Sequence, residues 1–107
     1  MKYDVINLNE IYNLKGGTLT AICSDMPLDR GSGWKRPAVI IAPGGGYWFC
    51  SKRENEPVAF EFLARGYNVF VLEYLCKPDG VSYPEQLLEI ACAVDYVKKN
   101  SKHYCIN

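Results

Sequence analysis

The sequence predicts an α/β fold, on the basis of three observations. Two short segments, Ala38–Ala42 and Asn68–Tyr74, are almost continuously apolar, which is typical of strands covered on both faces. Two other segments, Asn55–Arg65 and Pro84–Lys99, carry apolar side chains at helical spacing. Strands that alternate with helices usually form a mostly parallel sheet with helices on both faces. We therefore expect the order strand, strand, strand, helix, strand, helix.

The first third of the chain is expected to be β structure. Thr18–Ser24 alternates polar and apolar residues, as a half-buried strand does, and Gly16–Gly17 before it is a turn signal. Asp4–Leu8 is a candidate partner strand. Proline, aspartate, glycine and serine then accumulate over Asp25–Arg36, which predicts a surface loop.

The first helix is predicted over Asn55–Arg65. Val58 and Phe62 form an i, i+4 apolar pair on it. Pro57 falls in the first turn, where a missing N–H is harmless, and Gly66 is well placed to end the helix.

The second helix is predicted over Pro84–Lys99. Ser82 followed by Glu85 resembles a capping box at its start. Its apolar residues are expected to fall on one buried stripe, formed by Leu87, Ile90, Ala91, Val94 and Val97.

Charge and cysteine content exclude several function classes. Twelve Lys and Arg residues balance twelve Asp and Glu residues and are interspersed with them, which argues against nucleic acid or an anionic membrane as a partner. The five cysteines are irregularly spaced and include no Cys-x-x-Cys, so neither a disulfide framework nor a zinc site is expected. The N-terminus has no apolar signal segment. We expect a cytoplasmic protein with reduced thiols and with no metal or other cofactor.

The candidate functional motif is the loop Pro43-Gly44-Gly45-Gly46-Tyr47, directly after the apolar strand. Glycines let a ligand approach backbone N–H groups, which can hold a phosphate or the oxyanion formed when an ester carbonyl is attacked. The phosphate alternative is weaker, because Phe49 stands where a third glycine would be needed and no Gly-Lys-Ser/Thr follows. A tight turn that simply needs glycine is the structural alternative.

The same stretch resembles the oxyanion-hole loop of α/β-hydrolases of the esterase/lipase group, which often have His-Gly-Gly-Gly there. Ser51–Ala59, Gly66–Leu72 and Tyr83–Pro84 are similar to a branch with acetylxylan-esterase-like and feruloyl-esterase-like members, in which Pro replaces that His. The likeness covers roughly Arg36–Asn107. It implies an incomplete α/β-hydrolase domain over residues 1–107, with antiparallel N-terminal strands.

The resemblance implies roles for four residues of the glycine loop. Gly45 and Gly46 would donate backbone N–H groups to the oxyanion. Tyr47 and Trp48 would line the substrate pocket, with packing against the first helix as the alternative. The intact relatives would cleave a small-molecule ester or an acylated carbohydrate through an acyl-enzyme. The 107 residues contain no Gly-x-Ser-x-Gly, so the nucleophile, the acid and the catalytic histidine of the family would lie beyond Asn107.

Other reactive residues have simpler interpretations. His103, the single histidine, lies in a polar tail and is expected to be a solvated cation at a helix end. Cys50 has no base near it in the sequence, and Ser51 with Glu54 is typical of a helix cap.

Three functional interpretations stay open at this point. The chain is a truncated, inactive esterase, one half of an enzyme completed by another chain, or a small binding module on a partial hydrolase scaffold. In the hydrolase strand order, one edge of Ala38–Ala42 would be unpaired, which predicts self-association through that edge.

Overall fold

The computed structural model describes residues 2–24, 35–42, 56–74 and 85–106. Within them lie four strands: β1 (Lys2–Asn7), β2 (Thr18–Cys23), β3 (Ala38–Ile41) and β4 (Asn68–Glu73). The helices are the 3-10 turn η1 (Leu8–Glu10), α1 (Glu56–Ala64), α2 (Glu85–Lys99) and the short α3 (Ser101–Tyr104). The predicted order of strands and helices is confirmed, whereas η1 and α3 were not expected.

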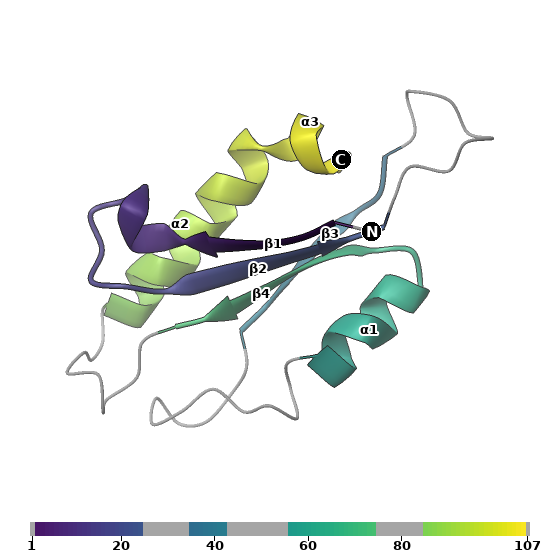
Figure 1. Cartoon of the computed structure of the whole chain (residues 1–107), viewed down its shortest axis with the longest axis horizontal. Coiled ribbons are helices and arrows are strands. Elements are labelled where there is room, and N and C mark those ends of the chain that lie inside the picture. Colours follow the sequence, from purple (N-terminus) through teal and green to yellow (C-terminus); the bar gives the residue numbers. More distant parts are fainter. Residues whose placement is uncertain (1, 25–34, 43–55, 75–84, 107) are drawn as a thin grey trace.

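The described strands form one mixed sheet in the order β1-β2-β4-β3 (Figure 1). β1 pairs antiparallel with β2, β2 pairs antiparallel with β4, and β3 pairs parallel with β4. The expected antiparallel pairing of the N-terminal strands is therefore confirmed, whereas the sheet is mixed rather than mostly parallel over the described residues. A parallel pair needs a crossover connection, and α1 provides it between β3 and β4.

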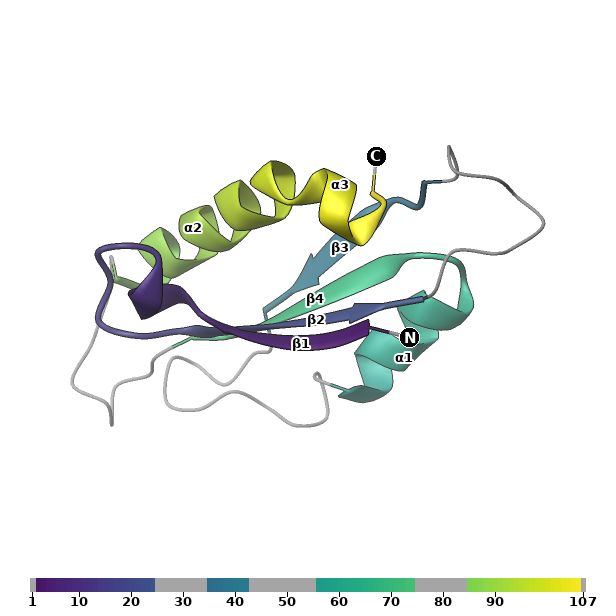
Figure 2. The same ribbon diagram turned by 45° about the horizontal axis from the view of Figure 1, so that its top comes forward.

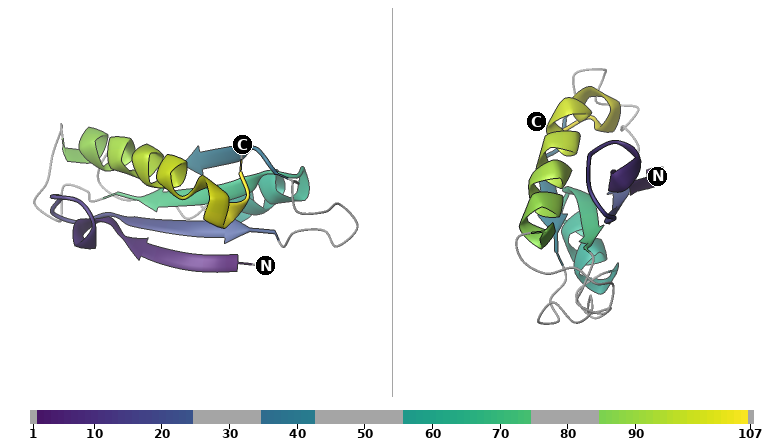
Figure 3. Two further views of the ribbon diagram at one scale, coloured as in Figure 1. Left: turned by 90° about the horizontal axis from the view of Figure 1, so that it is seen from above. Right: turned by 90° about the vertical axis from the view of Figure 1, so that its left-hand side faces the viewer.

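Helices cover both faces of the sheet (Figure 3). Side chains alternate along β4, so that Phe70 and Leu72 point toward α2 and α3 while Val69 and Val71 point toward α1. Phe70 packs in one cluster with Ala93 and Tyr104, and Val69 and Val71 pack in the other with Ala59. The continuous apolar sequence of β4 is thus explained by burial on both faces, as predicted.

β3 has the same type of sequence but a different environment. Its residues range from exposed at Ala38 to half-buried at Val39, Ile40 and Ile41, because β3 lies at the edge of the described sheet. The prediction that this strand is covered on both faces is met only in part. β1 forms the opposite edge (Figure 3).

Gly66 ends α1 as predicted. It has a φ of +95°, which glycine adopts without a steric penalty. The N–H of Gly66 donates to the carbonyl of Leu63, and the N–H of Tyr67 donates to the carbonyl of Phe62. These two hydrogen bonds form a Schellman motif, which satisfies carbonyl groups at the helix end and turns the chain into β4.

The predicted buried stripe of α2 is confirmed for Val97, which is buried, and in part for Ile90, which is half-buried against the core. It is wrong for its other three members. Leu87 is 52% exposed, Val94 is 37% exposed, and Ala91 between them is also exposed. On the buried side of α2, Val97 is joined by three residues that were not predicted to be buried: Gln86, Glu89 and Ala93. The helix is therefore rotated about its own axis relative to the expected orientation. As a result, the described residues leave Leu87, Ala91 and Val94, at positions i, i+4 and i+7, exposed.

No helix in the described segments is both long and apolar enough to cross a lipid bilayer.

Candidate functional site

The carboxyl ends of β3 and β4 define the place of the candidate site. The two strands are parallel and in register, with Ile41 beside Val71, so they end at the same edge of the sheet. The chain leaves this edge after Ala42 toward the glycine loop. The glycine loop and the residues after it lie in segment 43–55, outside the described residues, so their predicted roles stay predictions. These residues are Gly45, Gly46, Tyr47, Trp48, Cys50, Ser51 and Glu54.

The start of β2 contributes to the same edge. Thr18 pairs with Glu73 at the end of β4, and the buried Gly17 precedes it with a φ of +106°. A Cβ atom at Gly17 would overlap with Oε1 of Glu89 on α2. The chain therefore needs glycine here twice over, for its backbone conformation and for the close approach of the Glu89 carboxyl.

Two buried polar side chains of α2 were missed by the sequence analysis. Glu89 is fully buried and Gln86 is 2% exposed, although both residue types are usually found at the surface. Their i, i+3 spacing is the signal that could have identified them, since it places both on one side of the helix. Burial of a carboxyl group is costly without polar partners. The buried Glu89 side chain therefore requires polar contacts in this part of the molecule, near the edge where β3 and β4 end.

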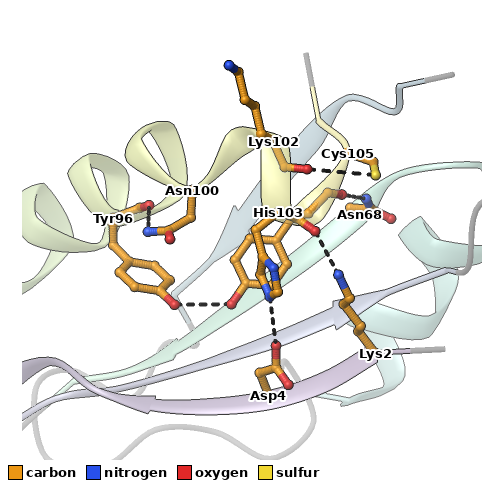
Figure 4. Close-up of polar contacts among 9 residues, drawn as sticks. Lys2, Asp4, Asn68, Tyr96, Asn100, Lys102, His103 and Cys105 are labelled. Atoms are coloured by element: carbon orange, nitrogen blue, oxygen red, sulfur yellow. Dashed lines mark hydrogen bonds and ion pairs between the residues drawn. The ribbon is translucent and has the colours of Figure 1, made fainter. Parts of the chain in front are cut away.

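His103 lies close to Asn68 at the start of β4, whereas the candidate site is placed where β3 and β4 end (Figure 4). The carbonyl of Tyr104, next to it, accepts a 2.8 Å hydrogen bond from the side chain of Asn68, the first residue of β4. The His103 side chain is 57% exposed, and its Nε2 atom is 3.8 Å from Oδ2 of Asp4. The interpretation of His103 as a solvated residue at a helix end agrees with this position, where it cannot reach the carboxyl edge.

The groups around His103 stabilise the fold. Nζ of Lys2 donates a 2.7 Å hydrogen bond to the carbonyl of His103, which ties β1 to α3 (Figure 4). The hydroxyl groups of Tyr96 and Tyr104 are 3.1 Å apart, and the Tyr104 ring packs edge-on against Phe70. Burial, and then the hydrogen bond with Tyr96, raise the pKa of Tyr104, so its phenol stays neutral.

A second structural contact ties the segment after η1 to α2. The hydroxyl of Tyr12 donates a 2.8 Å hydrogen bond to Asp95, whose carboxylate is 3.1 Å from Nζ of Lys99. Burial and the hydrogen bond to Asp95 raise the pKa of Tyr12 to about 12. Hydrogen bonds from Tyr12 and Lys99 lower the pKa of Asp95.

The described cysteines and acidic residues suggest no further catalytic centre. Cys23 is buried, as predicted, and burial raises the pKa of its thiol to about 11, which disfavours the reactive thiolate. Cys92 is half-buried rather than buried. Within the described segments, no group of three or more His, Cys, Asp or Glu side chains could hold a metal ion.

Comparisons with known proteins extend this picture beyond the described residues. The family model BD-FAE matches residues 25–107. Endo-1,4-beta-xylanase B of Butyrivibrio fibrisolvens is 41% identical over 75 residues, which are 68% of this chain and 12% of the xylanase. The chain thus corresponds to a small part of that curated relative.

Solved structures match the whole chain. MGS-M1, an α/β hydrolase enzyme from a Medee basin deep-sea metagenome library, is 40% identical with a TM-score of 0.88, over 100% of this chain and 43% of its own. The carboxylesterase Cest-2923 of Lactobacillus plantarum is 25% identical with a TM-score of 0.89, over 100% of this chain and 38% of its own. An acetyl ester-xyloside bifunctional hydrolase of Caldicellulosiruptor lactoaceticus is 27% identical with a TM-score of 0.82, over 97% of this chain and 39% of its own. The chain spans less than half the length of these three hydrolases.

Proposed function

The chain belongs to the BD-FAE family of α/β-hydrolase fold esterases, and we propose that it forms the N-terminal part of a serine carboxylic ester hydrolase. One observation carries this proposal. The whole chain superposes on part of the metagenomic α/β hydrolase at 40% identity, with the strands and helices in the same arrangement. The glycine loop then follows β3, the strand whose carboxyl end faces the proposed site.

The proposed chemical role of this part is to stabilise the oxyanion. The backbone N–H groups of Gly45 and Gly46 donate hydrogen bonds to the carbonyl oxygen of the ester as a serine attacks its carbon. Such a donor is worth about 3–4 kcal/mol of transition-state stabilisation in an intact hydrolase. The parallel ladder between β3 and β4 supports this role, since it holds Ile41, two residues before the loop in the sequence, in register with Val71.

The proposed substrate is a small-molecule ester or an acylated carbohydrate. The similarity to an acetyl ester-xyloside bifunctional hydrolase supports this class of substrate. Tyr47 and Trp48 follow the oxyanion glycines directly and are proposed to form a wall of the pocket. Aromatic faces pack well against sugar rings and acyl chains.

The 107-residue chain is proposed to be inactive by itself. It contains no Gly-x-Ser-x-Gly nucleophile turn, and the exposed His103 lies at the wrong end of the sheet to serve as the base. The oxyanion donors alone cannot replace the serine and its general base.

A chimera tests the proposed role of the loop. Residues 1–106 are joined to the part of the metagenomic hydrolase that follows the matched region, and hydrolysis of p-nitrophenyl acetate and acetylated xylan is measured. Valine keeps the backbone N–H but disfavours the backbone conformations and the close approach that glycine permits, so Gly45→Val is expected to move this donor away from the oxyanion. We expect kcat to fall by up to about 10²–10³-fold with little change in KM, because the interaction forms only in the transition state. Gly31→Val, in the predicted loop before β3, is the matched control and is expected to keep kcat. An unchanged kcat in the Gly45→Val chimera would show that Gly45 does not stabilise the oxyanion and has only a structural role.

A further inference from the structure

The face of the sheet that carries α1 is covered only in part. Ile22 of β2 and Val69 of β4 pack on this face with Ala59 of α1. Figure 2 shows α1 near the end of the sheet where β1 begins, and away from η1, where β1 ends. Ile6 packs toward α2, so its neighbour Val5 points to the α1 face, where it is 59% exposed. The exposed part of this face therefore lies toward the end of β1.

A row of polar side chains crosses this exposed part. Asn7 at the end of β1 pairs with Thr18 at the start of β2, and Thr18 pairs with Glu73 at the end of β4. Val71, two residues before Glu73, packs toward α1, which places the row on the α1 face. Paired side chains on adjacent strands lie about 5 Å apart, so the row extends over about 10 Å. We refer to Asn7, Thr18 and Glu73 as the polar row.

The polar row ends beside the proposed oxyanion loop. Val71 lies beside Ile41 in the parallel ladder, and the glycine loop begins two residues after Ile41 in the sequence. Glu73, two residues after Val71, is the exposed residue of β4, whose other five residues are buried. The row therefore extends from the outer strand β1 to the edge of the sheet where an ester is proposed to bind.

The polar row combines hydrogen-bonding groups that suit sugar hydroxyls. The hydroxyl of Thr18 and the amide of Asn7 can each donate and accept, whereas the Glu73 carboxylate accepts. The amide of Asn7 donates a 3.4 Å hydrogen bond to Glu10, which orients it. Asn7 and Glu73 are exposed and Thr18 is half-buried, so a ligand can reach all three.

The residues beside the row add the apolar contacts that a sugar ring also makes. Val5 and Thr20 form the next pair on the same face, and Tyr3 lies two residues before Val5. Thr20 is half-buried, and Tyr3 is 53% exposed. A few polar groups beside apolar and aromatic side chains are typical of surfaces that bind small polar ligands.

We propose that the polar row binds the sugar part of an acylated carbohydrate and thereby favours such esters over esters of simple alcohols. This inference rests on the proposed function. Three observations support a carbohydrate as the ligand: the hydroxyl and amide groups of the row, the exposed apolar residues beside it, and the position of Glu73 next to the strand that leads to the oxyanion loop. A phosphorylated or carboxylated ligand would instead be repelled by the Glu73 carboxylate.

Binding is tested on the 107-residue chain itself, by following backbone amide NMR signals during titration with xylotetraose. We expect changes at Thr18, Thr20 and Glu73, and none at Gly66, which lies before the start of β4. Glycerol at the same hydroxyl concentration is expected to leave these signals unchanged, because its hydroxyl groups cannot span the row.

Two variants test the side chains of the row. Thr18→Val removes a hydroxyl but keeps a β-branched side chain, and Glu73→Gln removes the charge but keeps the size. We expect each variant to weaken xylotetraose binding by about threefold to tenfold. Glu61→Gln is the matched control, because it removes an exposed carboxylate of α1 and is expected to leave binding unchanged. Unchanged amide signals elsewhere in the chain show that each variant is folded.

The chimera shows whether the row acts in selecting the substrate. We expect Glu73→Gln to raise KM for acetylated xylotetraose by about threefold to tenfold with kcat near that of the parent, and to affect p-nitrophenyl acetate less. The loss is expected in KM because the row contacts the sugar both before and during the reaction. Glu61→Gln is again the control and is expected to keep the parent KM.

The outcomes separate the polar row from the proposed catalytic role. Binding at the row by a chain whose chimera hydrolyses no ester supports the row and contradicts the catalytic role. Ester hydrolysis with the same KM in the parent, Thr18→Val and Glu73→Gln chimeras supports the catalytic role and overturns the row. Absence of amide changes up to about 10 mM xylotetraose, or the same changes with glycerol, also overturns it.

Discussion

The N–H of Arg36 donates a hydrogen bond to the carbonyl of Cys105 across 2.9 Å, and this contact brings the segment after α3 alongside the start of β3. Cys105 makes the contact possible by adopting a left-handed backbone, with φ 55° and ψ 50°. The N–H of Ile106 then donates to the carbonyl of Ser101, which closes the end of α3. These hydrogen bonds thus connect the segment before β3, at the edge of the described sheet, to the end of α3.

Substitutions of Cys105 test the importance of this turn. Cys105→Val should lower the free energy of unfolding by about 1–2 kcal/mol, because a β-branched residue is strained in the left-handed region. Cys105→Gly should leave stability within about 1 kcal/mol of the parent chain, since glycine adopts this conformation freely but has a more flexible unfolded state. Urea unfolding of the two variants measures the difference. Equal stability of both variants would mean that the backbone conformation of Cys105 does not matter for the fold.

Gly17 is expected to be the most sensitive glycine among the described residues. Gly17→Ala should lower the free energy of unfolding by about 2–4 kcal/mol, because it adds an overlap with Glu89 to the backbone strain at a φ of +106°. Gly66→Ala is the matched control. It has a similar φ of +95°, but the nearest atom to its Cβ would be 4.0 Å away, so it should cost only about 1 kcal/mol. Comparable losses for both variants would argue against close packing of Glu89 on Gly17.

Tyr12 should make stability depend on alkaline pH. Its pKa is raised in the folded state from 10.0 to about 12, so the folded chain retains the proton that the unfolded chain loses. This contribution to stability is complete below the unfolded pKa and is lost as pH rises from 10.0 through about 12. Asp95 has the opposite effect, because its pKa is lowered in the folded state. Its contribution to stability is present above the unfolded pKa and is lost as pH falls through the folded pKa.

The Tyr12→Phe variant separates the contribution of this phenol from that of other groups. We expect lower stability than the parent at neutral pH, because the hydrogen bond to Asp95 is lost, and a shallower fall in stability on the alkaline side. The measurement is the unfolding free energy across that pH range. A parallel pH dependence in parent and variant would show that Tyr12 does not titrate as its surroundings indicate.

The strands and main helices could be predicted from the sequence because local patterns determine them. The continuous apolar segments at β3 and β4, the alternation in β2 and the glycine after α1 each indicate an element or its end. The parallel pairing of β3 with β4 followed from the helix between them. The 3-10 turn at Leu8 and the short α3 carry no periodic pattern long enough to be recognised.

The orientation of α2 could not be predicted in this way. Its apolar stripe through Leu87, Ala91 and Val94 is real, but the described sheet packs against a neighbouring side of the helix that includes Glu89. A hydrophobic pattern indicates which residues prefer burial and does not specify which partner buries them. The same limit applies to β3, whose sequence is that of a central strand although it lies at an edge of the described sheet.

Hydrolysis of p-nitrophenyl acetate tests the central claim most directly, that this chain holds the oxyanion loop but lacks the nucleophile. The purified 107-residue chain is expected to give no turnover above buffer, and the chimera with the remaining part of the metagenomic hydrolase is expected to turn the ester over. Cys50→Ser in the isolated chain is the control for a reactive thiol. Turnover by the isolated chain at the rate of the chimera, retained in Cys50→Ser, would contradict the account.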